Sequence, residues 1–209
     1  GPLTNGVNHL GTIDQGDLDQ WTFTANQGDR IALQVAELSG GAAFSPMIEL
    51  FGPDGARVEA DSGGVTARVD AQAEIGGTYT VLISDLTQTG SGTYQLQLAQ
   101  SPGAITVPAG DEGGALSDGV DQDGTITLGD LDLWSFTAVP GDQVTLQLTE
   151  LTGGAGFTPK IELFAPNGDR KAVAQNATVA TLDAAIEVGG TYNVLVSDAT
   201  KSGTGTYRL

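Results

Sequence analysis

The chain has 209 residues, with 31 glycines, no cysteine and only 6% aromatic residues. The absence of cysteine excludes disulfides and thiolate metal sites, and the glycine-rich composition favours short strands joined by many turns. The 26 acidic residues against 8 basic ones give a formal charge of −18, which repels phosphate backbones and argues against nucleic-acid binding. No apolar run approaches the ~20 residues that a membrane span needs.

Short strands separated by turn signals are predicted along the first half of the chain. An entry segment with a short strand at 11–13 leads into a strand in which Trp21 and Phe23 face the core, because strand side chains alternate. Further strands, each bounded by Gly, Pro, Asp or Ser clusters, are predicted at 31–36, 47–51, 65–73, 78–85 and 94–98. A turn at 53–55 adds a hairpin partner to the strand at 47–51. About eight strands at this spacing predict a β-sandwich.

The whole pattern then occurs a second time. Leu3 aligns with Leu116 and Leu96 with Leu209, a constant offset of 113 residues (116 − 3) without a gap. Roughly half of the aligned positions are identical, so the chain is predicted to hold two copies of one domain.

Four segments follow from this duplication. Residues 1–2 resemble the scar that a protease leaves on removing an expression tag, 3–99 and 116–209 are the two sandwiches, and 100–115 is a Pro/Gly-rich acidic linker. A short strand is expected at Ala104 to Val107. Because the second copy stops at the equivalent of Leu96, we expect a monomeric fragment of a longer array.

Five motifs recur in the same order in both copies. They are Gly-Asp-x-Asp-x-Trp-x-Phe-Thr, Gly-Asp-(Arg/Gln)-(Ile/Val), Ile-Glu-Leu-Phe-x-Pro-(Asp/Asn)-Gly, Gly-Gly-Thr-Tyr-x-Val-Leu and Gly-(Ser/Thr)-Gly-Thr-Tyr. This order resembles the bacterial pre-peptidase C-terminal (PPC) domain over nearly all of both copies. The resemblance implies a jelly-roll β-sandwich that serves as a non-catalytic accessory module of secreted or cell-surface bacterial proteins. The collagen-binding domains of clostridial collagenases are similar, and some of those bind calcium.

No residues form a recognisable catalytic set. The single histidine, His9, is replaced by Gln122 in the second copy, so we interpret it as a surface loop residue rather than a general base. Glu49 and Glu162 are expected on a solvated strand face. The chain is therefore predicted not to be an enzyme.

Calcium is the one cofactor that the sequence suggests, because hard cations prefer carboxylate and amide oxygens. Oxygen-bearing side chains recur at four equivalent positions on the entry segment and at the start of the Trp-containing strand: Asn5 and Asp118, Asn8 and Asp121, Asp17 and Asp130, Asp19 and Asp132. In the collagen-binding domains, acids before the corresponding strand and on the incoming linker hold calcium. Asp17, Asp19, Asp130 and Asp132 match that pattern, whereas the linker acids do not align. The alternative is that these residues form Asx-turns or bind backbone amides.

Ligand binding by aromatic side chains would depend on accessible rings. Most aromatics alternate in phase with apolar neighbours and are expected in the core, but Phe44 and Phe157 lie in loops and are the candidate ligand-binding rings. The alternative is that they pack beneath the adjacent turn.

The preferred hypothesis is a tandem pair of secreted or cell-surface modules that space, anchor or target a larger bacterial protein. The alternative is a calcium-dependent binding module for an extracellular polysaccharide or a collagen-like matrix protein.

Overall fold

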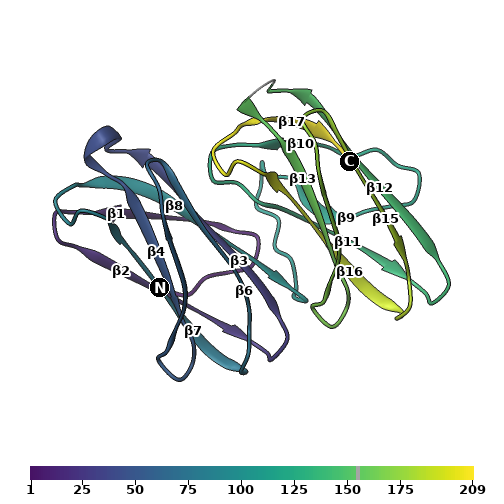
Figure 1. Cartoon of the computed structure of the whole chain (residues 1–209), viewed down its shortest axis with the longest axis horizontal. Coiled ribbons are helices and arrows are strands. Elements are labelled where there is room, and N and C mark those ends of the chain that lie inside the picture. Colours follow the sequence, from purple (N-terminus) through teal and green to yellow (C-terminus); the bar gives the residue numbers. More distant parts are fainter. Residues whose placement is uncertain (154–155) are drawn as a thin grey trace. The chain divides into compact units, whose positions relative to one another are not determined.

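The computed structural model describes residues 1–153 and 156–209, and the regular secondary structure of these residues is almost wholly β-strand (Figure 1). The chain divides into two compact units, Gly1–Gln100 and Ser101–Leu209, which we call unit 1 and unit 2. This division falls inside the predicted linker. Among the described residues, no helix is long and apolar enough to cross a membrane.

Unit 1 is built from two four-stranded sheets. In chain order its strands are β1 (Asn8–Ile13), β2 (Leu18–Ala25), β3 (Arg30–Ser39), β4 (Pro46–Phe51), β5 (Arg57–Ser62), β6 (Thr66–Gln72), β7 (Gly77–Asp85) and β8 (Gly92–Ser101). One sheet has the order β1-β8-β3-β6 and the other β2-β7-β4-β5. A 3-10 turn, η1 (Gly41–Ala43), lies between β3 and β4.

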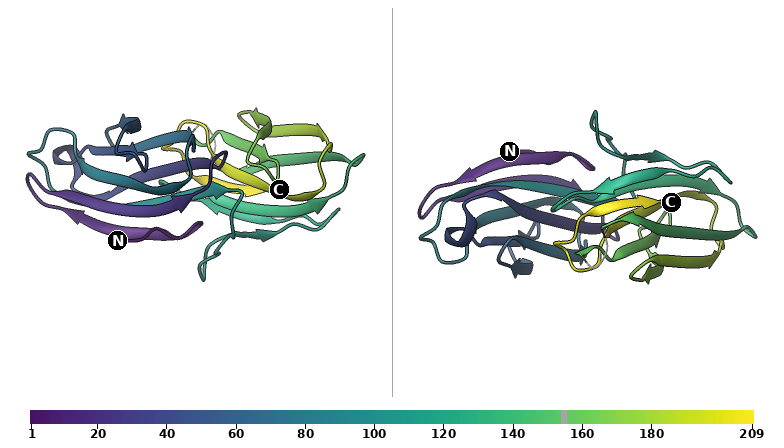
Figure 2. Two further views of the ribbon diagram at one scale, coloured as in Figure 1. Left: turned by 90° about the horizontal axis from the view of Figure 1, so that it is seen from below. Right: turned by 90° about the horizontal axis from the view of Figure 1, so that it is seen from above.

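Unit 2 repeats this arrangement and adds one strand. Its strands are β9 (Gly113–Ala115), β10 (Asp123–Ile126), β11 (Asp132–Ala138), β12 (Gln143–Thr152), β13 (Pro159–Phe164), β14 (Arg170–Gln175), β15 (Val179–Ala185), β16 (Gly190–Asp198) and β17 (Gly205–Arg208). The sheets have the orders β10-β17-β12-β15 and β14-β13-β16-β11-β9. The edge-on views in Figure 2 show the two sheets of each unit as two layers.

The shared strand order is that of an eight-stranded jelly roll, in which two antiparallel sheets enclose one core. The predicted fold class, two tandem jelly-roll-like β-sandwiches, is therefore confirmed. Period-two alternation directs Tyr79, Val81 and Ile83 of β7 inward, and each of these side chains is at most 1% exposed.

The predicted linker is not a plain connector. Gln100 and Ser101 belong to the end of β8, and β9 pairs in parallel with β11, through Leu133↔Gly113 and Trp134↔Gly114. The prediction of a short strand at Ala104 to Val107 is wrong, because those residues are not part of a β-strand. The linker segment instead forms a strand at β9, where Gly113 and Gly114 have positive φ and allow the chain to approach the backbone of β11 closely.

Candidate cation site

Three aspartates of unit 2 converge at the start of β11. Asp132 is the first residue of β11, Asp130 lies in the turn before it, and Asp111 lies just ahead of β9. Because β9 runs parallel to β11, it brings Asp111 beside the other two. One carboxylate oxygen from each residue lies within 4.8 Å of the others, which is close enough for a single ion to contact all three.

Asp132 is the most enclosed of the three. Its side chain is 0% exposed, and its Oδ2 accepts a 2.5 Å hydrogen bond from the Tyr207 hydroxyl. That hydroxyl in turn accepts a 3.0 Å bond from Trp134 Nε1. Asp132 Oδ1 is fully buried and has no hydrogen-bond partner among the described residues. A buried oxygen left in this condition costs about 1–3 kcal/mol or more if charged, so a further partner would be stabilising.

The other two aspartates are partly held by backbone amides. Asp130 is 4% exposed, and its carboxylate accepts bonds from Leu131 N at 3.0 Å and Thr127 N at 3.2 Å. Asp111 is half-buried, and its Oδ1 accepts a 3.0 Å bond from Glu112 N. These bonds are of the Asx-turn kind that the sequence offered as the alternative to metal binding. They leave other lone pairs of both carboxylates free to coordinate.

The three carboxylates oppose one another's ionisation. Burial, followed by the charge of Asp130, raises the pKa of Asp132 to about 9. Burial, followed by the charge of Asp111, raises the pKa of Asp130 to about 7. Burial also raises the pKa of Asp111. A divalent cation at this point would remove the repulsion, and oxygen ligands of this kind suit a hard ion such as calcium.

Unit 1 has the same motif in a different setting. The Tyr94 hydroxyl donates to Asp19 Oδ2 at 2.6 Å and accepts from Trp21 Nε1 at 2.8 Å, as in unit 2. However, Asp17 is exposed and binds the neighbouring Leu18 N, and Asp19 is half-buried. No described residue of unit 1 supplies a third acid here.

The four remaining cation candidates lie elsewhere. Asn5 exchanges two hydrogen bonds with the backbone of Gln100, and Asn8 pairs with Gln97 in the β1–β8 ladder. Asp118 and Asp121 line a groove on unit 2. The structure therefore does not bring these four residues to the aspartate cluster.

The two candidate ligand-binding rings are buried. Phe44 is 0% and Phe157 1% exposed, and both belong to the cores of their units. The expectation that these rings are accessible is wrong, and the alternative that they pack beneath the adjacent turn is correct. The reason is visible at Gly92 and Gly205, whose missing side chains leave the space that each ring fills.

His9 is also placed differently from the expectation. It lies within β1, half-buried, rather than in a surface loop. Its Nε2 accepts a 3.0 Å bond from Thr4 N, and its ring packs edge-on against Trp21 with centroids 5.3 Å apart. Burial lowers the pKa of His9.

Sequence reasoning missed Asp111. The repeat could not reveal it, because Asp111 lies ahead of the aligned copies, and the linker acids show no alignment with a known ligand pattern. A signal did exist in Gly113-Gly114, two glycines in a row directly after Asp111 and Glu112. A Cβ on Gly113 would lie 2.5 Å from the Leu133 carbonyl oxygen, so this pair marks a close backbone approach.

No known protein-family profile and no curated protein sequence matches the chain. Among solved structures, it is similar to the M60 catalytic domain with CBM51 domains of Clostridium perfringens ZmpB (8% identity, TM-score 0.28), covering 90% of this chain and 33% of that one. It is also similar to the PBSX exported protein XepA (11%, TM-score 0.33, 99% and 88%). A third similar structure is the CBM22 tandem of Paenibacillus barcinonensis Xyn10C (10%, TM-score 0.27, 90% and 80%). The chain thus spans about a third of the ZmpB structure, and similarities this weak carry no information on ligand or activity. The resemblance to PPC domains stays a prediction.

Proposed function

We propose that the chain is a pair of non-catalytic β-sandwich modules and that unit 2 binds one calcium ion through Asp111, Asp130 and Asp132. The modules act as spacer, adhesion or substrate-targeting domains of a secreted or cell-surface bacterial protein, as the resemblance to PPC domains implies. The observation that carries the calcium proposal is the buried, unpartnered Oδ1 of Asp132 within a cluster of three acids.

The protein side of the site supplies position and charge. Asp132 is fixed by Tyr207 and Asp130 by two backbone amides, so both carboxylates are held in place before an ion arrives. Asp111 comes from a separate segment, so an ion bound by all three would fasten that segment to β11. Calcium commonly takes six to eight oxygens, and backbone carbonyls or water would complete the shell.

Calorimetric titration of calcium into chelator-treated protein tests the proposal. We expect one site per chain, with heat lost in Asp132→Asn and Asp111→Asn. Asp19→Asn, which makes the equivalent change in unit 1, is the matched control and should leave the titration unchanged. In hydrogen-exchange measurements on the intact chain, calcium should slow exchange around 111–115 and 130–134 and leave unit 1 unaffected. An absence of heat together with an unchanged melting temperature in millimolar calcium would overturn the proposal.

A further inference from the structure

Two of the six asparagines precede a glycine: Asn5-Gly6 in unit 1 and Asn167-Gly168 in unit 2. The backbone nitrogen that follows an asparagine can attack its side-chain amide, and glycine hinders this attack least because it has no side chain. The other four asparagines precede His, Gln, Ala or Val, whose side chains obstruct the attack. The structure then separates the two Asn-Gly pairs.

Asn167-Gly168 lies in the turn that joins β13 to β14. Asn167 is exposed, and Gly168 is buried with a φ of 86°, which glycine adopts without strain. The hydrogen bonds of the pair stay inside this turn. Gly168 N donates to Ala165 O at 2.9 Å, and the side chain of Asn167 exchanges two bonds with Asp169. A local opening of the turn therefore frees both the side-chain amide and the nitrogen that attacks it.

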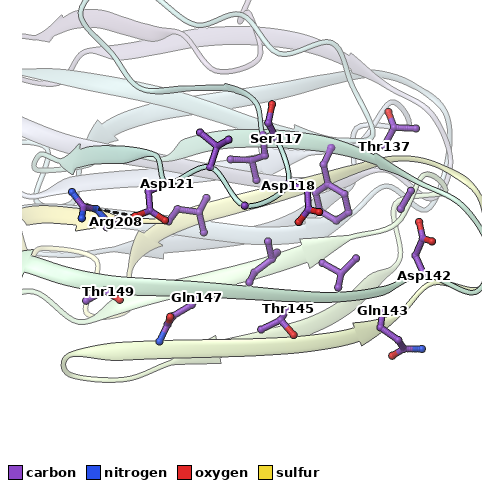
Figure 3. Close-up of a pocket in the computed structure, with 18 residues that line it drawn as sticks. Ser117, Asp118, Asp121, Thr137, Asp142, Gln143, Thr145, Gln147, Thr149 and Arg208 are labelled. Carbon is purple, nitrogen blue, oxygen red and sulfur yellow. Dashed lines mark ion pairs between the residues drawn. The ribbon is translucent and has the colours of Figure 1, made fainter.

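Asn5-Gly6 is held by a distant part of the chain. Asn5 Nδ2 donates to Gln100 O at 2.9 Å, and Asn5 Oδ1 accepts from Gln100 N at 2.7 Å, although Gln100 lies 95 residues further along the chain. Gly6 N donates to Leu98 O at 2.8 Å. This pair is freed only when the entry segment leaves β8, which is a larger opening. In unit 2 the place of Asn5 is taken by Asp118, which already carries a carboxylate and lies beside the groove in Figure 3, so that unit has only one Asn-Gly pair.

Unit 1 has the same turn with an aspartate in place of Asn167. This residue is Asp54, and Gly55 N donates to Gly52 O at 2.9 Å while Ala56 N donates to Asp54 Oδ1 at 3.0 Å. The corresponding groups make the same two bonds in unit 2. An aspartate at residue 167 is thus compatible with the turn. An isoaspartate is not, because it inserts a methylene group into the main chain and displaces the amides that close the turn.

We propose that Asn167 is a site of spontaneous deamidation, through which unit 2 acquires aspartate or isoaspartate in the β13–β14 turn without an enzyme. Hydroxide removes the proton of the Gly168 nitrogen, which then forms a bond to Asn167 Cγ. The bond from Cγ to Nδ2 breaks, and the nitrogen leaves as ammonia after taking a proton from water. Water then opens the cyclic succinimide at either carbonyl, giving aspartate or isoaspartate. Water and hydroxide are the only co-reactants.

The two products differ in what they do to the hairpin. Aspartate replaces the 2.8 Å hydrogen bond from Asn167 Nδ2 to Asp169 Oδ2 by two neighbouring carboxylates and keeps the main chain. Isoaspartate displaces the start of β14, where the Arg170 guanidinium pairs with the buried Glu162 at 3.0 Å. Hydrogen exchange at 163–171 should therefore quicken in the isoaspartate form and stay near the parent rate in Asn167→Asp.

The test incubates the full chain at body temperature and mildly alkaline pH and follows each asparagine by peptide mapping with mass spectrometry. In the folded chain, Asn167 should deamidate at least about tenfold faster than Asn5, because its opening is local. In concentrated urea the two residues should react at similar rates, since neither is then held. Asn167→Gln is the matched control and should show no reaction at this position in the same time, because a six-membered ring closes more slowly.

Three results would overturn the proposal. The first is a folded chain in which Asn167 reacts no faster than Asn176, which precedes Ala177, during a time in which the unfolded chain deamidates. The second is an Asn5 that reacts as fast as Asn167 in the folded chain. The third is a difference between Asn5 and Asn167 that persists unchanged in urea, since the fold would then not be its cause.

Discussion

The two units place the same motif in two different environments. In unit 1, Asp17 accepts a hydrogen bond from a backbone amide and the half-buried Asp19 accepts one from a tyrosine hydroxyl. In both units a preceding segment pairs in parallel with the strand of this motif, through Pro2 and Thr22 in unit 1 and through β9 and β11 in unit 2, and in unit 2 the residues just ahead of β9 bring a third acid, Asp111, to the equivalent pair. The comparison teaches that the motif supplies a fixed carboxylate. The neighbouring segment decides whether that carboxylate is solvated or lies in a cluster of acids that repel one another.

The units share a chain of hydrogen bonds that can be broken equally in both. It runs from tryptophan to tyrosine to aspartate. The tyrosine ring lies over a glycine of β1 in unit 1 and of β10 in unit 2, and a Cβ on Gly11 or Gly124 would lie 2.3 Å from the ring. Gly124→Ala should destabilise unit 2 by about 3 kcal/mol, at the upper end of overpacking costs, and weaken calcium binding. Gly11→Ala should have the same effect on unit 1 without touching calcium.

Thermal unfolding followed by hydrogen exchange on the intact chain separates the two units. Gly64→Ala is the control, because a Cβ there meets nothing within 4 Å. An equal loss in both units from Gly124→Ala would show that the units are not independent.

Asp85 organises a loop of unit 1. It accepts hydrogen bonds from Ser45 N, Gly90 N and Thr89 N and from the Thr87 hydroxyl. Asp85→Ala should cost about 1–3 kcal/mol, because it leaves buried amides without an acceptor. Asp198→Ala should cost unit 2 a similar amount, since Asp198 accepts from Thr158 N and Gly203 N.

The effect of Asp85 also depends on pH. Burial is the largest influence and raises the pKa of Asp85, but the hydrogen bonds together outweigh it and hold the pKa well below its usual range. Its stabilisation is therefore present above about pH 4 and is lost as the pH falls further. The difference in urea midpoint between Asp85→Ala and the parent chain should narrow as the pH falls from 4 to 2, and a constant difference would contradict this account.

Between pH 5 and 8 the stabilities of the two units should change in opposite directions as the pH rises. The raised pKa values of Asp130 and Asp132, about 7 and about 9, mean that the folded state of unit 2 binds more protons than the unfolded chain. Calcium-free unit 2 should therefore lose stability as the pH rises from about 4 towards 9. The pKa of His9 is lowered mainly by burial, so unit 1 should gain slightly as the pH rises through about 6.5.

Local exchange rates at pH 5 and pH 8 in chelator, corrected for the intrinsic pH dependence, check this contrast. Asp132→Asn should flatten the response of unit 2, and calcium should reverse it. If the stabilities of both units changed with pH in the same direction, the idea that burial and mutual repulsion raise the pKa values of Asp130 and Asp132 would be contradicted.

The smallest expected difference involves ion pairs on β4 and β13. In unit 1, Arg57 pairs with Glu49, whose side chain is 20% exposed. In unit 2, Arg170 and Lys160 both pair with Glu162, which is 3% exposed. Arg57→Ala should cost less than about 1 kcal/mol, as surface pairs do, and Arg170→Ala more, because a buried carboxylate loses a partner. Chemical denaturation with the two variants side by side measures the difference.

The sequence by itself determined the duplication, the sandwich fold and the inward faces of strands such as β7, because period-two alternation and Gly-containing turns are local signals. It also singled out Asp130 and Asp132. Only the tertiary structure decided that Asp111 joins them, that Tyr207 holds Asp132, and that Phe44 and Phe157 are core residues. These features depend on which distant segments the strand order places side by side, and no local pattern encodes that proximity.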